Sequence, residues 1–220
     1  MKDPIESADS QEKIFKVALP VSLEAVFQTS LGLVDQIIVG TLGATAVAAV
    51  GLCNSISFIV MLLYSAIGTG AGVLVAQAFG RNDVNEVSRV ATLSLIMSGI
   101  FGLFTTVPLI LYPGPILRLI GAPDELVNAG SVYFQLFSAA APLIVMSAVS
   151  TATFRSLNDS TTPMFITMGA VDLNTLLGLF LVFGWGPFPK LGVVGAGLAT
   201  LIAQGARCFG EQVLLCTQSS

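Results

Sequence analysis

The 220-residue chain is 54% hydrophobic and only 10% charged, with a mean hydropathy of +0.87, whereas about a quarter of the residues of a soluble domain are charged. The formal net charge is −4 and the sequence has no basic patch, which argues against a nucleic-acid partner. This composition predicts a protein that lies in a lipid bilayer.

Six apolar blocks follow one another along the chain, each longer than the roughly 18 residues needed to cross a membrane as a helix. The short alternating segments of a β-barrel are not seen. Short connections make sequential helices neighbours, so the expected fold is an all-α integral membrane protein with one six-transmembrane-helix bundle at residues 14–216. The blocks cover residues 14–40, 47–79, 90–112, 126–154, 164–184 and 193–216.

The N-terminal segment, residues 1–13, is expected to be a cytoplasmic tail. It is acidic and lacks a small-residue cleavage site, so the first block is not expected to be a cleavable signal peptide. Asp9 and Glu12 resemble a capping box, which predicts that the first helix begins near Ser10 and follows the membrane surface before entering it.

The second block, residues 47–79, would be about 50 Å long as a helix and exceeds the bilayer thickness. It must tilt, bend or protrude, and Gly68–Gly72 is where bending would cost least. The glycines of this GTGAG stretch resemble part of a phosphate loop, but the loop lysine is missing. Close helix packing is the preferred interpretation, both here and for the small residues of Gly192–Thr200.

The basic residues predict the orientation of the bundle. If the N-terminus is cytoplasmic, two of the nine basic residues, Arg118 and Lys190, lie at the outer ends of the blocks. The positive-inside rule then predicts a multi-pass protein with both termini in the cytoplasm, expected in the plasma (inner) membrane; residues 217–220 form its last cytoplasmic segment. The inner ends hold the other seven: Lys2, Lys13, Lys16, Arg81, Arg89, Arg155 and Arg207.

Metal, disulfide and enzymatic chemistry are not expected. The chain has no histidine, and its three cysteines, Cys53, Cys208 and Cys216, lie in apolar segments without metal-ligand spacing. We expect these thiols to serve in packing. No nucleophile elbow or phosphate loop is present, so no cofactor is predicted and the chain is not expected to be an enzyme.

The first block carries two acids, although a carboxylate in a spanning helix costs at least about 2.5 kcal/mol. At 100° per residue, Glu24, Gln28 and Asp35 fall within about 40° of one another around the helix. This polar stripe must face a partner or a water-filled cavity. A hydrogen-bond network that only joins helices is the alternative to a functional site. Pro20 lies one turn before the stripe, so bending there is a hypothesis for how a change in charge could move the helix.

The fifth block adds Asp172 and Asn174, which lie about 200° apart and cannot share one site on a regular helix. Asn174 is the expected cavity residue, with Thr167 about 20° away in projection. For Asp172, a function and a simple hydrogen bond between helices remain equally open.

Four ordered segments resemble the multidrug and toxic compound extrusion (MATE) transporters. They are ALPVSLEAVFQTSLGLVDQIIVGTLGATAVAAVG (18–51), VAQAFGRNDVNEVSRV (75–90), FRSLNDSTTPM (154–164) and VFGWGPFPKLGVVGAGLAT (182–200). Members of that family have twelve helices in two lobes and export organic cations and other amphiphiles in exchange for protons or sodium. The resemblance implies that this chain is the N-terminal lobe, with a C-terminal lobe as its partner and an amphiphilic small molecule as substrate.

The resemblance also implies roles for individual residues. Asp35 matches the family's first-helix acid, which is protonated or helps to bind the coupling ion, Gln28 is a polar neighbour, and Asn174 matches the fifth-helix asparagine. Thr200 corresponds to a polar residue of the sixth helix. Where some branches have Asp followed by Pro four residues after the asparagine, this sequence has Gly178 and Leu179, so Asp35, with Glu24 or Asp172, is left as the ion switch.

Two other functions stay open at this level. One is a flippase for lipid-linked or polyanionic molecules, which would need a strongly basic cavity that the blocks do not suggest. The other is an inactive or self-assembling half-transporter that acts as a membrane interaction protein.

Overall fold

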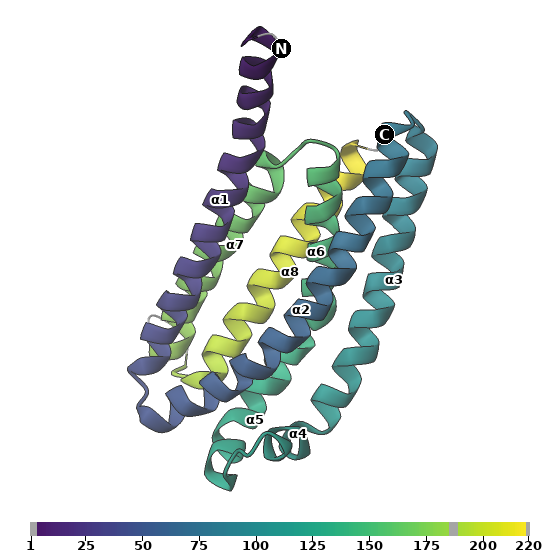
Figure 1. Ribbon diagram of the computed structural model, residues 1–220. Helices are drawn as coiled ribbons and strands as arrows, with labels where there is room; N and C mark the ends of the chain where they lie inside the picture. Colours follow the sequence, from purple (N-terminus) through teal and green to yellow (C-terminus); the bar gives the residue numbers. More distant parts are fainter. Residues whose placement is uncertain (1–3, 185–188, 219–220) are drawn as a thin grey trace.

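The computed structural model describes residues 4–184 and 189–218, and describes side chains from Val17 onward except those of Leu31 and Gln218. In these ranges the chain folds into helices that pack side by side (Figure 1). The helices are α1 (Pro4–Gly40), α2 (Ala44–Gly80), α3 (Val84–Leu111), α4 (Pro113–Leu119), α5 (Asp124–Ala139), α6 (Ala141–Ser156), α7 (Thr161–Phe183) and α8 (Val193–Gln218).

The predicted all-α bundle with six spans is confirmed. Five helices are long and apolar enough to cross a membrane, and α5 with α6 makes a sixth span that is bent by 41° at Ala140. The bend divides the block predicted at residues 126–154. Pro142 stands near the start of α6, where its missing N–H costs no helical hydrogen bond, so the chain can change direction there at little cost.

The predicted start of the first helix near Ser10 is wrong. α1 begins at Pro4, and its first turns extend beyond the ends of the other helices (Figure 1). Proline is well tolerated in the first turn of a helix, whereas the capping-box pattern at Asp9 and Glu12 falls inside the observed helix. Pro20 also lies inside α1, which continues without a break to Gly40.

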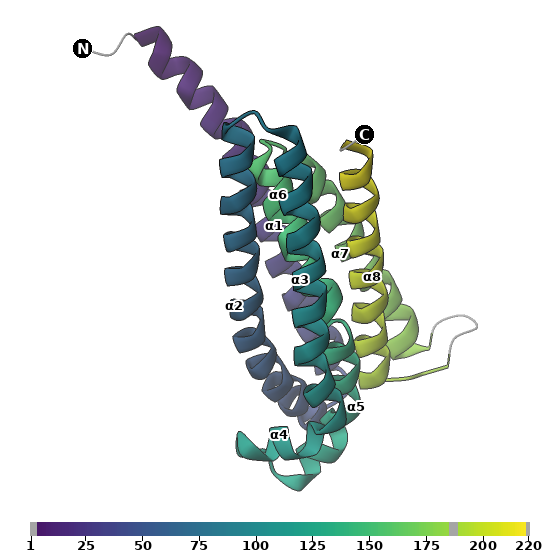
Figure 2. The same ribbon diagram turned by 90° about the vertical axis from the view of Figure 1, so that its right-hand side faces the viewer.

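α2 is continuous over the whole second block, and it curves in its first half rather than at Gly68–Gly72 (Figure 2). The glycines instead allow α2 to approach α6. A Cβ atom on Gly68 would lie 3.0 Å from the carbonyl oxygen of Ala148, and one on Gly72 would lie 3.2 Å from Cβ of Ala152. Ser156 Oγ donates to the carbonyl oxygen of Gly72 at 2.8 Å. The packing interpretation of the GTGAG stretch is therefore confirmed.

The small residues at the start of α8 serve the same purpose. A Cβ atom on Gly195 would lie 2.6 Å from the carbonyl oxygen of Leu181 in α7, and one on Gly197 would lie 3.1 Å from Cβ of Leu136 in α5. α8 thus packs tightly on both helices. Gly184, which ends α7 with a φ of +72°, turns the chain in the left-handed conformation that glycine adopts without strain.

Two of the three cysteines fulfil the predicted packing role. Cys53 and Cys208 are buried, and Cys53 belongs to a core cluster with Val50, Val127 and Phe134. Cys216, near the end of α8, is exposed in the described chain, and its packing role stays a prediction.

Gly102 allows a close contact between α3 and α6 that can be tested. A Cβ atom there would lie 2.5 Å from Cα of Pro142, too close to be accommodated without movement of the backbone. We expect Gly102→Ala to destabilise the protein by about 1–3 kcal/mol, measured as a lower thermal unfolding temperature in detergent. Gly99→Ala is the matched control on the same helix, because its Cβ would meet only the flexible Met146 Sδ, at 3.5 Å. Equal stability of the two variants would contradict this packing.

Candidate functional site

The polar stripe of α1 faces α7, and Asp35 meets Asn174 there. Asn174 Nδ2 donates to Asp35 Oδ2 at 3.5 Å, the long end of hydrogen-bond range. Asn174 is buried and Asp35 is half-buried. Thr167, two turns before Asn174 on α7, also faces α1, as its projected angle predicted. The first-helix acid and the fifth-helix asparagine, 139 residues apart in sequence, therefore form one pair.

Tyr133 on α5 is a member of this site that the sequence reasoning missed. Its ring is buried, and it lies close enough to Asp35 to feel the charge of the carboxylate. The available signal was the one tyrosine of the block at residues 126–154, which does not reveal the direction of its side chain.

Gly178, where the family resemblance implies an acid in some branches, lies on the side of α7 that faces α1. A Cβ atom on Gly178 would lie 3.7 Å from Cδ1 of Ile38. The position is thus oriented toward the first helix but has no side chain. In the described part of the bundle, Asp35 is left as the acid that faces Asn174.

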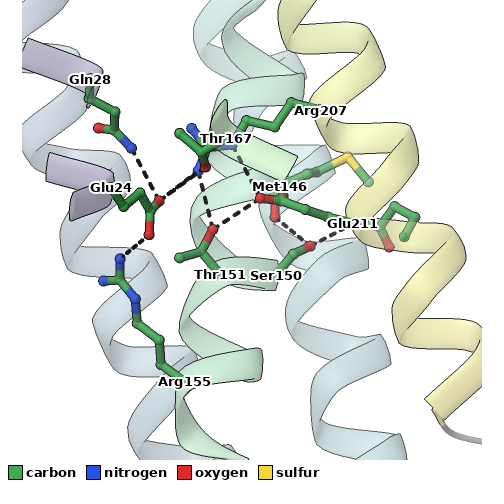
Figure 3. Close-up of polar contacts among 10 residues, drawn as sticks. Glu24, Gln28, Met146, Ser150, Thr151, Arg155, Thr167, Arg207 and Glu211 are labelled. Atoms are coloured by element: carbon green, nitrogen blue, oxygen red, sulfur yellow. Dashed lines mark hydrogen bonds and ion pairs between the residues drawn. The ribbon is translucent and has the colours of Figure 1, made fainter. Parts of the chain in front are cut away.

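Glu24 belongs to a different cluster, which Figure 3 shows. Its side chain is only 2% exposed, and its Oε2 lies 2.7 Å from Nη2 of Arg155 on α6. Its Oε1 lies 3.5 Å from Nη2 of Arg207 on α8 and accepts a hydrogen bond from Thr167 at 3.1 Å. Gln28 Nε2 donates to the same oxygen at 3.2 Å. One carboxylate therefore connects α1 to α6, α7 and α8.

Arg207 extends this cluster to a second buried acid. Its Nε donates to Glu211 Oε1, one turn later on α8, at 3.2 Å. Its Nη2 donates to Thr151 Oγ1 at 3.2 Å, and the same hydroxyl donates to Glu211 Oε1 at 3.1 Å. Two acids, Glu24 and Glu211, thus balance two arginines, Arg155 and Arg207, so the cluster is neutral overall (Figure 3).

Glu24 was expected to act together with Asp35 as an ion-switch acid. The structure places it in ion pairs with two arginines, which compensate its charge, and its part in ion coupling stays a prediction. The arginines were expected at the inner ends of the blocks, yet the Arg207 side chain is only 14% exposed. Arg207 and Glu211, four residues apart inside an apolar block, were a readable signal that was not used.

In the described part of the chain, the other predicted residues form no hydrogen bond with Asp35 or Asn174. Gln28 bonds to Glu24 rather than to Asp35. Thr200 Oγ1 donates to the carbonyl oxygen of Ala196 within its own helix, at 3.1 Å. Asp172 is exposed on the far side of α7 from Asn174, as the projection predicted. Among the described residues, no group of three or more His, Cys, Asp or Glu side chains is placed to hold a metal ion.

The comparison with protein families decides where this helix arrangement belongs. The MatE family model matches residues 20–180, which covers α2–α6, nearly all of α7 and the polar face of α1. The chain belongs to the MatE family. The predicted family is thereby confirmed, and the matched range includes the first-helix segment that contains Asp35; the fourth segment, residues 182–200, lies beyond this range.

The curated relatives of this MatE chain are about twice as long. It is 30% identical over 186 residues to the probable multidrug resistance protein YoeA of Bacillus subtilis, covering 84% of this chain and 40% of YoeA. It is 28% identical over 199 residues to the probable multidrug resistance protein NorM of Thermotoga maritima, covering 90% of this chain and 43% of NorM. The MatE chain therefore spans less than half the length of these relatives.

A solved structure has the same fold. The outward-facing conformation of a multidrug resistance MATE family transporter of the MOP superfamily matches this MatE chain with a TM-score of 0.85 and 28% sequence identity. The match covers 92% of this chain and 44% of that transporter. The six spans described above thus correspond to one half of a transporter.

Proposed function

We propose that this chain is the N-terminal half of a secondary active efflux antiporter that exports organic cations or other amphiphiles in exchange for H⁺ or Na⁺. Membership of the MatE family, and the likeness to proteins named for multidrug resistance, support the transport class. The remaining half would supply the other wall of the substrate cavity. The observation that carries the proposal is the pairing of Asp35 with Asn174 between α1 and α7.

The proposed mechanism uses two states of Asp35. A carboxylate among apolar helices is costly when it is charged and is made neutral by a proton or by a bound sodium ion. Asn174 holds the carboxylate in either state, because an amide can both donate and accept hydrogen bonds. A cationic substrate and the coupling ion would then compete for one negative charge, so that binding of one favours release of the other.

Bending of α1 would connect this charge to movement. Pro20 removes one backbone hydrogen bond from the first half of α1, so the helix resists bending less at this point. Glu24, one turn later, is held by Arg155 and Arg207. In this proposal, α1 moves around an anchored segment when the charge at Asp35 changes.

A flippase for polyanionic molecules is less well supported. Such a cargo needs excess positive charge in the cavity, whereas the inward-facing arginines Arg155 and Arg207 are paired with Glu24 and Glu211. The cluster therefore offers no net positive charge to a polyanion.

Ion-gradient-driven efflux tests the proposal. The full-length gene product is reconstituted into lipid vesicles with a fluorescent organic cation, and proton and sodium gradients are applied separately. We expect accumulation or release of the dye under one gradient and none without a gradient. A rate of dye movement that is the same with and without either gradient would contradict antiport.

The 220 residues alone should insert into a bilayer but should not transport. Without a second lobe, one side of the cavity would open to lipid, where polar groups such as Asp35 are poorly stabilised. Vesicles that contain only this chain are expected to show the dye flux of protein-free vesicles. Gradient-driven efflux from them would instead favour a self-assembling half-transporter.

The orientation of the bundle can be measured by cysteine labelling. The turn between α2 and α3 lies at one end of the bundle, and the end of α7 and the start of α8 lie at the other (Figure 1). We propose that the first of these ends is cytoplasmic, as the distribution of basic residues favours. With the exposed native Cys216 replaced by Ser in both variants, Asn85→Cys and Lys190→Cys should therefore react with a membrane-impermeant maleimide from opposite sides. Asn85→Cys should react only when the cytoplasmic side is accessible. Labelling of both from one side would refute this topology.

A further inference from the structure

Four donors from four helices converge on the Glu24 carboxylate (Figure 3). Two are the guanidinium groups of Arg155 and Arg207, at 2.7 Å and 3.5 Å. The other two are neutral, Thr167 Oγ1 at 3.1 Å and Gln28 Nε2 at 3.2 Å. We call the three donors outside α1, namely Arg155, Thr167 and Arg207, the carboxylate cradle. Its guanidinium and hydroxyl groups suit a carboxylate, whichever molecule carries it.

The carboxylate cradle is held in place without Glu24. Arg207 Nε donates to Glu211 Oε1 at 3.2 Å, and Arg207 Nη2 donates to Thr151 Oγ1 at 3.2 Å. α8, which carries Arg207, packs against both α6 and α7. Without Glu24, the cluster would keep two arginines and Glu211, which leaves one net positive charge. That charge matches one carboxylate, whereas a polyanion would bring an excess of negative charge.

The first half of α1 is held in the bundle mainly through Glu24. Between Val17 and Ser30, where all side chains are described, Glu24 is the one buried residue and the others are exposed or half-buried. A segment with so few buried apolar contacts detaches at a low free-energy cost once its ion pairs are replaced. The Arg155 side chain is 38% exposed, so the carboxylate cradle can be reached from outside the bundle.

We propose that the carboxylate cradle is a ligand-binding site, at which a small molecule with one carboxylate group takes the place of Glu24 and frees the first half of α1. Exchange of one carboxylate for another keeps the cluster neutral, so neither arginine is left without a counter-charge. Glu24 is a competitor attached to the protein, and the ligand must bind tightly enough to displace it. Such a ligand would release the anchored segment of the proposed transport mechanism, but its binding does not depend on antiport.

Hydrogen–deuterium exchange of the full-length gene product in detergent tests this replacement in the wild-type protein. Butyrate is the probe, and butyramide, which has a similar shape and no charge, is the control at equal ionic strength. We expect butyrate to raise the exchange rate of the backbone amides of residues 17–28 at least about twofold, because this segment is freed when Glu24 leaves the carboxylate cradle. Butyramide should have no effect, and peptides from α3, which contributes no donor to the cradle, should be unchanged by either compound.

Glu24→Ala removes the attached competitor and should open the carboxylate cradle to an added carboxylate. Acetate at about 100 times its dissociation constant should raise the unfolding temperature of this variant by at least about 3 °C, whereas acetamide should not. Glu24→Ala/Arg155→Gln keeps the charges of the cluster balanced but removes one donor of the cradle, so acetate should no longer raise the unfolding temperature. Glu24→Ala/Arg118→Gln is the matched control and should keep the response, because Arg118 is exposed and lies outside the cradle.

The proposal is overturned by any of three results. Unchanged exchange of residues 17–28 in butyrate would show that the carboxylate cradle serves Glu24 alone, even if Glu24→Ala responds to acetate. Equal effects of butyrate and butyramide, or an acetate response that persists in Glu24→Ala/Arg155→Gln, would exclude recognition of charge by the cradle. If Glu24→Ala does not fold, the exchange measurement on the wild-type protein decides. Neither measurement uses an ion gradient or a dye, so a failure here is distinct from failure of the efflux experiment.

Discussion

Asp35→Asn is expected to abolish gradient-driven export while the protein stays folded. Asparagine has nearly the same shape as aspartate, and its side-chain oxygen can still accept the hydrogen bond from Asn174 Nδ2. The variant is permanently neutral, so it can neither release a proton nor bind a sodium ion as a carboxylate does. Dye efflux from vesicles with the full-length variant should fall to the level of protein-free vesicles, with an unfolding temperature close to that of the wild type.

Asp172→Asn is the matched control for this experiment. It removes a carboxylate from the neighbouring helix α7, but Asp172 is exposed and lies away from Asn174. Export by this variant should be close to that of the wild type. If Asp35→Asn is well folded and exports dye against its gradient at the normal rate, Asp35 is not the ion switch and its pairing with Asn174 serves packing.

Glu24→Gln is expected to lower the stability of the protein strongly and to reduce export less than Asp35→Asn does. Glu24 is almost fully buried and compensates Arg155 and Arg207, so its neutralisation leaves two arginines with only Glu211 as counter-charge. Breaking a buried ion pair from one side costs about 3 kcal/mol. For a domain of this size, that corresponds to an unfolding temperature lower by about 6–12 °C, measurable by thermal unfolding in detergent.

The double variant Glu24→Gln/Arg155→Gln tests whether charge balance is the cause. It returns the cluster to one acid and one arginine, Glu211 and Arg207, which lie 3.2 Å apart. We expect it to recover part of the stability lost in Glu24→Gln, and the coupling energy follows from the double-mutant cycle. Asp172→Asn is an exposed change that is expected to lower the stability by less than about 0.5 kcal/mol. If Glu24→Gln proves as stable as Asp172→Asn, the ion pairs of Glu24 contribute little to stability.

The structure also changes what Glu24 is expected to do. From the sequence, Glu24 and Asp35 share one face of a helix and look like two members of one site. In the bundle, Glu24 lies beside Arg155 and Asp35 beside Asn174, so the stripe is divided between an anchoring cluster and a candidate ion site. The alternative of a hydrogen-bond network thus describes Glu24, whereas the switch hypothesis remains for Asp35.

The sequence by itself determined the membrane environment, the six spans, the polar face of the first helix and the family. Hydropathy and helical period are local properties, and a polar stripe can be read from one helix alone because each residue turns by about 100°. For the same reason Thr167 and Asn174 could be assigned to one side of their helix, and Asp172 to the other. The glycines of Gly68–Gly72 could be read as packing residues because a mid-membrane helix offers them few other roles.

Only the tertiary structure decided which residues meet. Glu24 pairs with Arg155 and Arg207, 131 and 183 residues away, and that choice depends on the rotation and depth of four helices relative to one another. The same is true of Tyr133, whose place on α5 within electrostatic range of Asp35 depends on how α5 packs against α2 and α8. The bend at Ala140 that divides the fourth block was not predicted, although Pro142 next to it lowers its cost. The helical period fixes the face of the helix on which a side chain lies. The helix that this face contacts is set by the packing of the bundle, because small residues such as Gly102 and Gly195 determine how closely and at what height neighbouring helices approach one another.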